Sequence, residues 1–165
     1  MNKTKKMMNV TMLIALAILF HLIESMIPLP IPVPGFKLGL ANIIGLIALY
    51  RYGFKEMLEV NIMRVVLASL LRGIIFGTPF YLSLGGVLLS SLAAYIAYKK
   101  TPMSIYGVSV ACSTFHCVGQ VIVVTIIYNQ FLMAALLPIL LVLSIPTGLI
   151  TGYLGNQVLT RIKEK

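Results

Sequence analysis

Residues 26–42 read Met26-Ile-Pro-Leu-Pro-Ile-Pro-Val-Pro-Gly-Phe-Lys-Leu-Gly-Leu-Ala-Asn42 and place four of the eight prolines of the chain at every second position. Proline lacks a backbone N–H and restricts the residue before it, so this stretch is neither helix nor strand. Long apolar runs with almost no charge lie on both sides of it. The pattern predicts a stiff, extended hinge between two membrane helices.

The composition indicates that the solvent of this chain is lipid. Of its 165 residues, 59% are hydrophobic and only 10% are charged, which is more apolar surface than a soluble domain of this size can bury. No polar linker divides residues 1–165, so we expect one integral membrane domain. No cleavage site of small residues follows the basic start, so no removable signal peptide is expected.

We expect an all-α fold, an integral membrane bundle of six transmembrane helices. About 20 apolar residues are needed to cross the bilayer, and prolines, glycines and charged turns divide the chain into six such stretches. The predicted helices cover residues 8–27, 38–50, 56–76, 80–98, 102–128 and 132–159, and the last is expected to kink at Pro138 or Pro146.

The net charge of +9 predicts topology rather than nucleic-acid binding, because Lys and Arg mark the cytoplasmic segments of membrane proteins. With six helices, ten of the 13 basic residues fall on one side of the bilayer. We therefore expect both termini in the cytoplasm. The ten are Lys3, Lys5, Lys6, Arg51, Lys55, Lys99, Lys100, Arg161, Lys163 and Lys165.

Small residues recur at four-residue spacing, as in Gly86, Ser90 and Ala94, and again in Gly148 and Gly152. Such rows let helix backbones approach closely in lipid. Two interpretations stay open: the rows pack the helices of this chain, or one of them docks a partner subunit.

Polar and ionisable side chains within apolar segments are costly, and this makes them the candidate functional residues. If the helices alternate in direction, these residues lie between the middle of the membrane and its outer surface. We expect them to converge on one cavity that opens outward, with the proline hinge as its rim. The candidate substrate-binding residues are Arg64, Asn42, His116, Gln120, Lys37, Arg72, Asn61 and Glu24.

Arg64 is the most specific of these candidates, because a buried guanidinium favours the recognition of phosphate or carboxylate. Its alternative role is an internal pair with Glu59 or Glu24. His116 and Gln120 lie four apart on one helical face, where they either bind a polar headgroup or bond a neighbouring helix.

Several absences limit the chemistry. All four acidic residues are Glu, and the sequence has neither a P-loop nor a Ser/His/Asp constellation. Clustered carboxylates for magnesium-bound diphosphate are also missing.

Cys112 and Cys117 are expected to be free thiols, and no metal or cofactor is expected. We therefore predict a protein that is not itself an enzyme, and active transport by it would need an ion gradient or an energising partner.

Five segments together resemble one bacterial family, named heptaprenyl diphosphate synthase component I or Gx transporter. They are Pro34-Gly-Phe-Lys-Leu-Gly-Leu-Ala-Asn42, Gly53-Phe-Lys-Glu56, Arg64, Gly107-Val-Ser-Val110 and His116-Cys-Val-Gly-Gln120. The family is similar to the substrate-binding subunits of energy-coupling-factor (ECF) vitamin transporters, which dock on a membrane coupling subunit with two ATPases. The enzyme name instead implies an accessory to a soluble prenyl synthase in menaquinone synthesis.

Three hypotheses follow. The first is a transporter subunit in the bacterial cytoplasmic membrane that binds a small anionic or amphipathic molecule, such as a vitamin, flavin or isoprenoid precursor. The second is a non-catalytic membrane accessory subunit of heptaprenyl diphosphate synthase. The third is a membrane anchor of a redox or quinone-linked complex, in which the polar groups only hold helices together.

Overall fold

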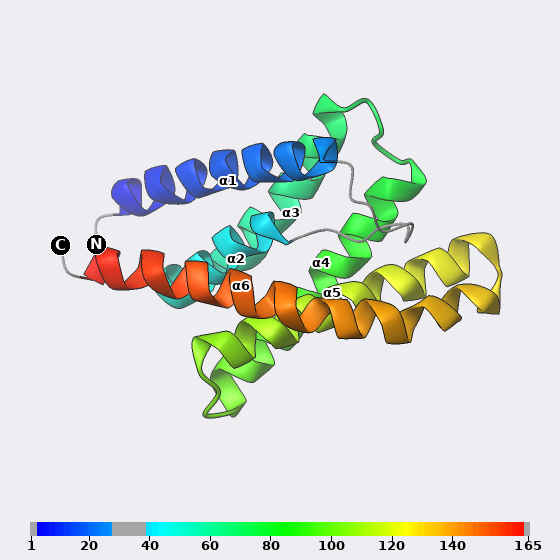
Figure 1. Ribbon diagram of the computed structural model, residues 1–165. Helices are drawn as coiled ribbons and strands as arrows, with labels where there is room; N and C mark the ends of the chain where they lie inside the picture. The colour runs from blue at the N-terminus through cyan, green and yellow to red at the C-terminus, as the bar shows by residue number, and fades with distance from the viewer. Residues whose placement is uncertain (1–2, 28–38, 164–165) are drawn as a thin grey trace.

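A computed structural model describes residues 3–27 and 39–163 (Figure 1). Within these ranges every regular element is a helix, so the all-α prediction is confirmed. The proline hinge and Lys37 lie outside the described residues. The elements are α1 (Lys3–Met26), α2 (Leu40–Tyr52), α3 (Phe54–Leu71), α4 (Thr78–Lys100), α5 (Ile105–Tyr128), the 3-10 helix η1 (Phe131–Leu136) and α6 (Leu137–Lys163).

Four stretches within the described part are long and apolar enough to cross a membrane: Lys3–Met26, Thr78–Lys100, Ile105–Tyr128 and Ala134–Ile162. This pattern is that of a multi-pass membrane protein. The helix α2 is apolar but has only 13 residues, a length of about 20 Å. It is therefore shorter than the hydrocarbon core of a bilayer, about 30 Å.

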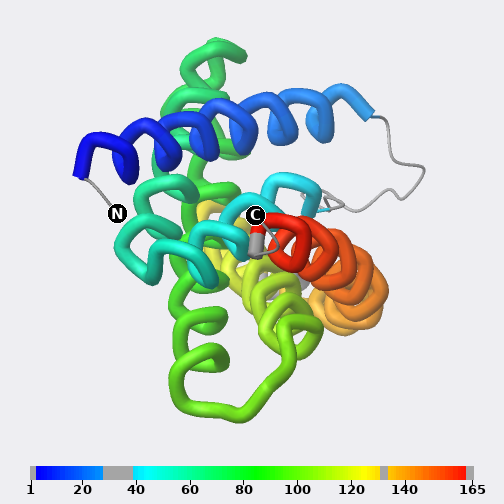
Figure 2. The backbone as a smooth tube through the Cα atoms, turned by 90° about the vertical axis from the view of Figure 1, so that its left-hand side faces the viewer, coloured from blue at the N-terminus to red at the C-terminus, as the bar shows by residue number. Residues whose placement is uncertain are grey.

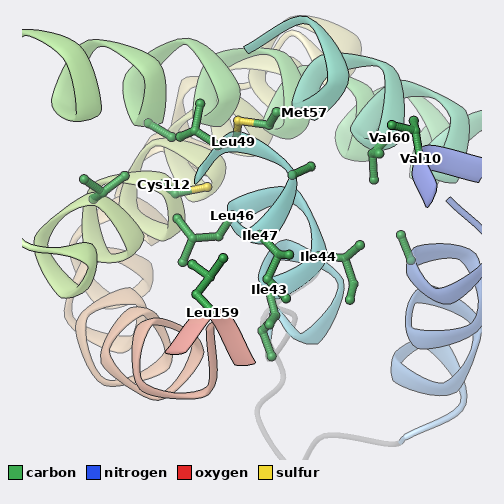
Figure 3. Close-up of a cluster of buried hydrophobic side chains, with 14 of the residues drawn as sticks. Val10, Ile43, Ile44, Leu46, Ile47, Leu49, Met57, Val60, Cys112 and Leu159 are labelled. Carbon is green, nitrogen blue, oxygen red and sulfur yellow. The ribbon is translucent and has the colours of Figure 1, made fainter. Parts of the chain in front are cut away.

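The short α2 is the centre of the largest apolar cluster (Figure 3). Seven of its apolar side chains are buried, and the cluster also contains residues of all five other α-helices. Val10 of α1, Val60 of α3, Cys112 of α5 and Leu159 of α6 belong to the same cluster. A helix that is hydrophobic all round is suited either to lipid or to a protein core, and the buried side chains of α2 show that it is a core helix of this bundle.

The predicted helix at residues 56–76 ends earlier than expected, at Leu71. Gly73 adopts φ 65°, and the N–H groups of Gly73 and Ile74 donate to the carbonyls of Leu70 and Ser69 at 3.0 Å. This is the Schellman arrangement, in which a glycine in the left-handed region closes a helix. The predicted end at residue 76 was wrong because Gly73 ends the helix first.

The predicted helix at residues 132–159 is divided in the structure. Residues 131–136 form η1, and α6 begins only at Leu137. Pro138 therefore lies in the first turn of α6, where proline is favoured and causes no kink. Pro146 is the proline inside this helix. The other predicted helices differ only at their ends: 8–27 is 3–26, 38–50 is 40–52, 80–98 is 78–100, and 102–128 is 105–128.

Glycines pack closely between helices, including Gly148 from one of the rows of small residues. A Cβ atom added to Gly119 of α5 would lie 2.5 Å from the carbonyl oxygen of Gly85 in α4. One added to Gly148 of α6 would lie 2.7 Å from the Cα of Val110 in α5. The glycines of α4, α5 and α6 thus pack the helices of this chain against one another.

Both chain ends, the α2–α3 turn and the α4–α5 turn lie towards the left of Figure 1. An ion pair between Lys6 and Glu56 joins the starts of α1 and α3. The rings of Tyr50 and Tyr98 join the ends of α2 and α4, with centroids 4.8 Å apart. We call this the basic end, because it carries the exposed side chains of Lys3, Lys5, Arg51, Lys55, Lys99, Lys100 and Arg161.

We predict that Gly119→Ala destabilises the protein by about 1–3 kcal/mol, because the added methyl group meets backbone that cannot yield. Gly107→Ala in the same helix is the matched control, since its Cβ would meet only the flexible Met103 side chain. Alanine is the better helix former, so the control should be neutral or stabilising. Thermal unfolding in detergent measures both, and equal midpoints would refute the close approach of α4 and α5.

Candidate functional site

All six α-helices contribute to one polar pocket inside the bundle, here called the central pocket. Its volume is about 30 Å³, enough for one or two water molecules. The lining residues are His21, Glu24, Gly39, Ala41, Asn42, Arg64, Val65, Ser83, Val87, Ser113, His116, Cys117, Gln120 and Thr147.

Arg64 reaches this pocket because it belongs to the buried face of α3, together with Met57, Val60, Asn61 and Ala68. Its side chain is only 2% exposed. The Nη2 group donates a hydrogen bond of 2.6 Å to Oδ1 of Asn42. Among the described residues, neither Nε nor Nη1 of Arg64 has a hydrogen-bond partner. A buried charge with unused donors is costly, so Arg64 retains the capacity to bind an anion.

Glu24 and His21 bring α1 to the same pocket. Both side chains are buried, and a carboxylate oxygen of Glu24 accepts a hydrogen bond from the backbone N–H of Gly39. Gly39 adopts φ 81° directly before α2, a conformation that favours glycine. The negative charge of Glu24 also acts on the guanidinium of Arg64. Glu24 therefore joins the end of α1 to the start of α2, next to the buried cation.

Another wall of the central pocket is formed by His116 and Gln120 of α5, and it depends on a glycine of α4. A Cβ atom added to Gly86 would lie 2.9 Å from the imidazole ring of His116 and 3.0 Å from Cγ of Gln120. Gly86 thus leaves the space that these two side chains occupy. Gln120 is 4% exposed, and its Nε2 has no hydrogen-bond partner in the described part of the chain.

The structure brings five of the eight predicted binding residues together at the central pocket: Arg64, Asn42, His116, Gln120 and Glu24. Asn61 lies outside the lining, where its Nδ2 donates to Ser91 Oγ at 2.9 Å. Arg72 is exposed at the end of α3 and does not line the pocket. Lys37 lies outside the described residues.

The structure distinguishes between the two suggested partners of Arg64. Glu59 is exposed, whereas Glu24 lines the pocket with Arg64. Cys112 and Cys117 are buried free thiols, as predicted. In residues 3–27 and 39–163, no three His, Cys, Asp or Glu side chains form a group that could hold a metal ion.

Sequence reasoning missed the hydroxyl side chains of the pocket, Ser83, Ser113 and Thr147. Serine and threonine also pack helices in membranes, where they bond one another as Ser109 and Thr151 do at 2.8 Å. Their presence in an apolar helix therefore carries no specific signal. The role of Gly86 in making space was equally hidden, because its four-residue spacing indicated only packing.

We predict that Asn42→Ala costs about 1–3 kcal/mol of unfolding free energy, because Nη2 of Arg64 loses its acceptor. The same substitution in an Arg64→Met background should cost much less, since no donor is then left unpaired. A double-mutant cycle from thermal unfolding in detergent measures the coupling. Additive effects of the two substitutions would show that this hydrogen bond contributes no stability.

Comparison with known proteins gives one match. The family model described as heptaprenyl diphosphate synthase component I matches residues 13–158. No curated protein matches the chain, and no solved structure does. The match covers α2 to α5, most of α1 and α6, and every residue of the central pocket. The chain therefore belongs to the heptaprenyl diphosphate synthase component I family.

Proposed function

We propose that this protein is the non-catalytic membrane component of a heptaprenyl diphosphate synthase, and that its central pocket binds the phosphate end of an isoprenoid. The family description names a component of that synthase. One observation carries the binding role: within residues 3–27 and 39–163, two nitrogens of the buried Arg64 have no hydrogen-bond partner, and the side chain lines a polar pocket. Phosphate is a preferred partner of guanidinium because charge-assisted hydrogen bonds are short and strong.

The arrangement of the other polar groups supports ligand binding over a purely structural role. Hydroxyl and amide pairs such as Asn61–Ser91 and Thr114–Ser144 already bond helix to helix. Arg64 does this through Nη2, and its Nε and Nη1 have no partner in the part of the chain that the structure describes. An anchor whose polar groups only hold helices together has no use for the two remaining donor groups of a buried cation.

The catalytic step belongs to a soluble partner in this proposal. The chain has no Asp and only four Glu, whereas diphosphate chemistry through magnesium needs clustered carboxylates. The exposed side chains of the basic end are suited to an acidic protein surface. This end would face the cytoplasm of a bacterial cell, because Lys and Arg mark the inner side.

For the topology we propose six membrane-embedded helices with both termini in the cytoplasm. The α2–α3 pair crosses as a short hairpin that other helices shield. In a Cys112→Ser/Cys117→Ser background, Gln130→Cys should react with a membrane-impermeant maleimide on intact cells. Met103→Cys, which is 52% exposed beside the basic end, should react only after permeabilisation. The reverse labelling pattern would overturn this topology.

Inorganic diphosphate is the simplest probe of the binding role. We predict that the detergent-purified protein binds it, and that Arg64→Met weakens this affinity about 10- to 100-fold, the value of hydrogen bonds to a charged group. Arg72→Met is the matched control, since Arg72 is exposed and outside the pocket. Isothermal titration calorimetry measures both variants. Unchanged affinity in Arg64→Met would refute the role of Arg64.

The second candidate function is a transporter subunit similar to the substrate-binding subunits of ECF transporters. The enclosure of the central pocket by all six α-helices favours it, because a transporter must surround its substrate within the membrane. Such a subunit would bind a small anionic or amphipathic molecule and dock on a coupling subunit with ATPases.

Affinity capture from native membranes distinguishes the two candidates. We expect a soluble prenyl synthase subunit to be recovered with the tagged protein. Recovery should fall at least several-fold when Arg51, Lys55, Lys99 and Lys100 are changed to alanine, because these exposed charges steer and hold an acidic surface. Recovery of a membrane coupling subunit with ATPases would instead establish the transporter.

A further inference from the structure

A second cavity lies directly beyond the central pocket, between α4, α5, η1 and α6. Its volume is about 200 Å³. We call it the tail cavity. It is lined by Leu82, Gln120, Val121, Val124, Tyr128, Leu136 and Leu140. Apart from the Gln120 amide and the Tyr128 hydroxyl, this lining consists of hydrocarbon side chains.

Gln120 lines both cavities and marks where they meet. It is 4% exposed, and its Nε2 donor has no partner among the described residues. Along α5 the residues four and eight positions further, Val124 and Tyr128, continue the lining of the tail cavity. Because residues four apart share a helix face, one face of α5 changes from polar at His116 to apolar beyond Gln120.

We infer that the two cavities form one site for a prenyl diphosphate, with its phosphate end at Arg64 and its hydrocarbon chain along α5. This inference rests on the function proposed above and adds the position and chemistry of the tail. Arg64 can bind the anionic end of such a molecule. The dry apolar lining of the tail cavity can hold its branched hydrocarbon chain. The Nε2 donor of Gln120 lies at the junction, where it can donate to the oxygen that joins head and chain.

The size of the tail cavity fits the first part of such a chain. A dry cavity of about 150 Å³ accommodates benzene. At that scale the tail cavity holds about eight carbons, between one and two isoprene units. Tyr128 at its far end is 52% exposed, so a longer chain leaves the protein there. In Figure 1 this is the right-hand end of the bundle, where α5 passes into η1 and α6.

Geranyl diphosphate and inorganic diphosphate separate the contribution of the tail from that of the head. By calorimetry in detergent, the unaltered protein should bind geranyl diphosphate at least about 10-fold more tightly, because each apolar group added in a fitted pocket contributes strongly. Val124→Trp and Leu136→Trp fill the tail cavity and should reduce this preference to near unity. Leu92→Trp, on an exposed position of α4, is the control and should retain it.

The outcomes distinguish this inference from the proposed function. If the tryptophan variants unfold normally and keep the preference for geranyl diphosphate, the tail cavity is not the site, while the head-binding role stands. If the unaltered protein binds neither probe, the proposed function itself fails. Equal affinity for dodecanoate and geranyl diphosphate would show a fatty-acid site and overturn the inference. Should tryptophan unfold the bundle, Val124→Phe provides the same test.

Discussion

The constraint on which this structure depends is the burial of one permanent positive charge, Arg64, in a bundle whose outside is apolar. Side chains such as Leu16, Leu88 and Val142 are exposed, as suits a surface that faces lipid. A guanidinium in that setting needs polar neighbours within reach, because unsatisfied charged groups cost several kcal/mol in hydrocarbon. Every α-helix supplies at least one residue to the pocket around it, and the polar faces therefore point inward.

The short α2 helix is what allows this arrangement. At about 20 Å it cannot cross the bilayer alone, so its first residues lie inside the bundle instead of at a surface. Asn42 thereby reaches Arg64, and Gly39 reaches Glu24. A full-length helix in the same place would carry its polar start to the membrane surface and leave Arg64 without its acceptor. The α2 helix is stable inside the bundle because its apolar residues pack against α1, α3, α5 and α6.

The sequence was sufficient for the helix order and for five of the 14 residues that line the central pocket. Arg64, Asn42, His116 and Gln120 were identified because polar residues are rare in apolar segments. Asn61 and Arg72 were predicted to bind substrate because of their estimated depth in the membrane. Depth does not give the direction in which a side chain points. In membrane helices apolar residues face both lipid and core, so the periodicity that orients soluble helices is weak. The helix end at Gly73 was missed because Gly77 and Pro79 carry a stronger turn signal.

The central pocket, at about 30 Å³, is too small for a phosphate group in the conformation described, so the proposed binding requires one wall to move. The cheapest wall to move is the one with the least packing. The α4–α5 and α5–α6 pairs pack most extensively, with glycines in backbone contact. The α1 helix packs less, lies at the edge of the bundle in Figures 1 and 2, and carries Glu24. The proposed phosphate end would repel that carboxylate, which favours outward movement of α1, while Arg64 of α3 would hold the anion in the pocket. The side chain that completes the closed pocket is thus also the one that an anionic ligand would displace.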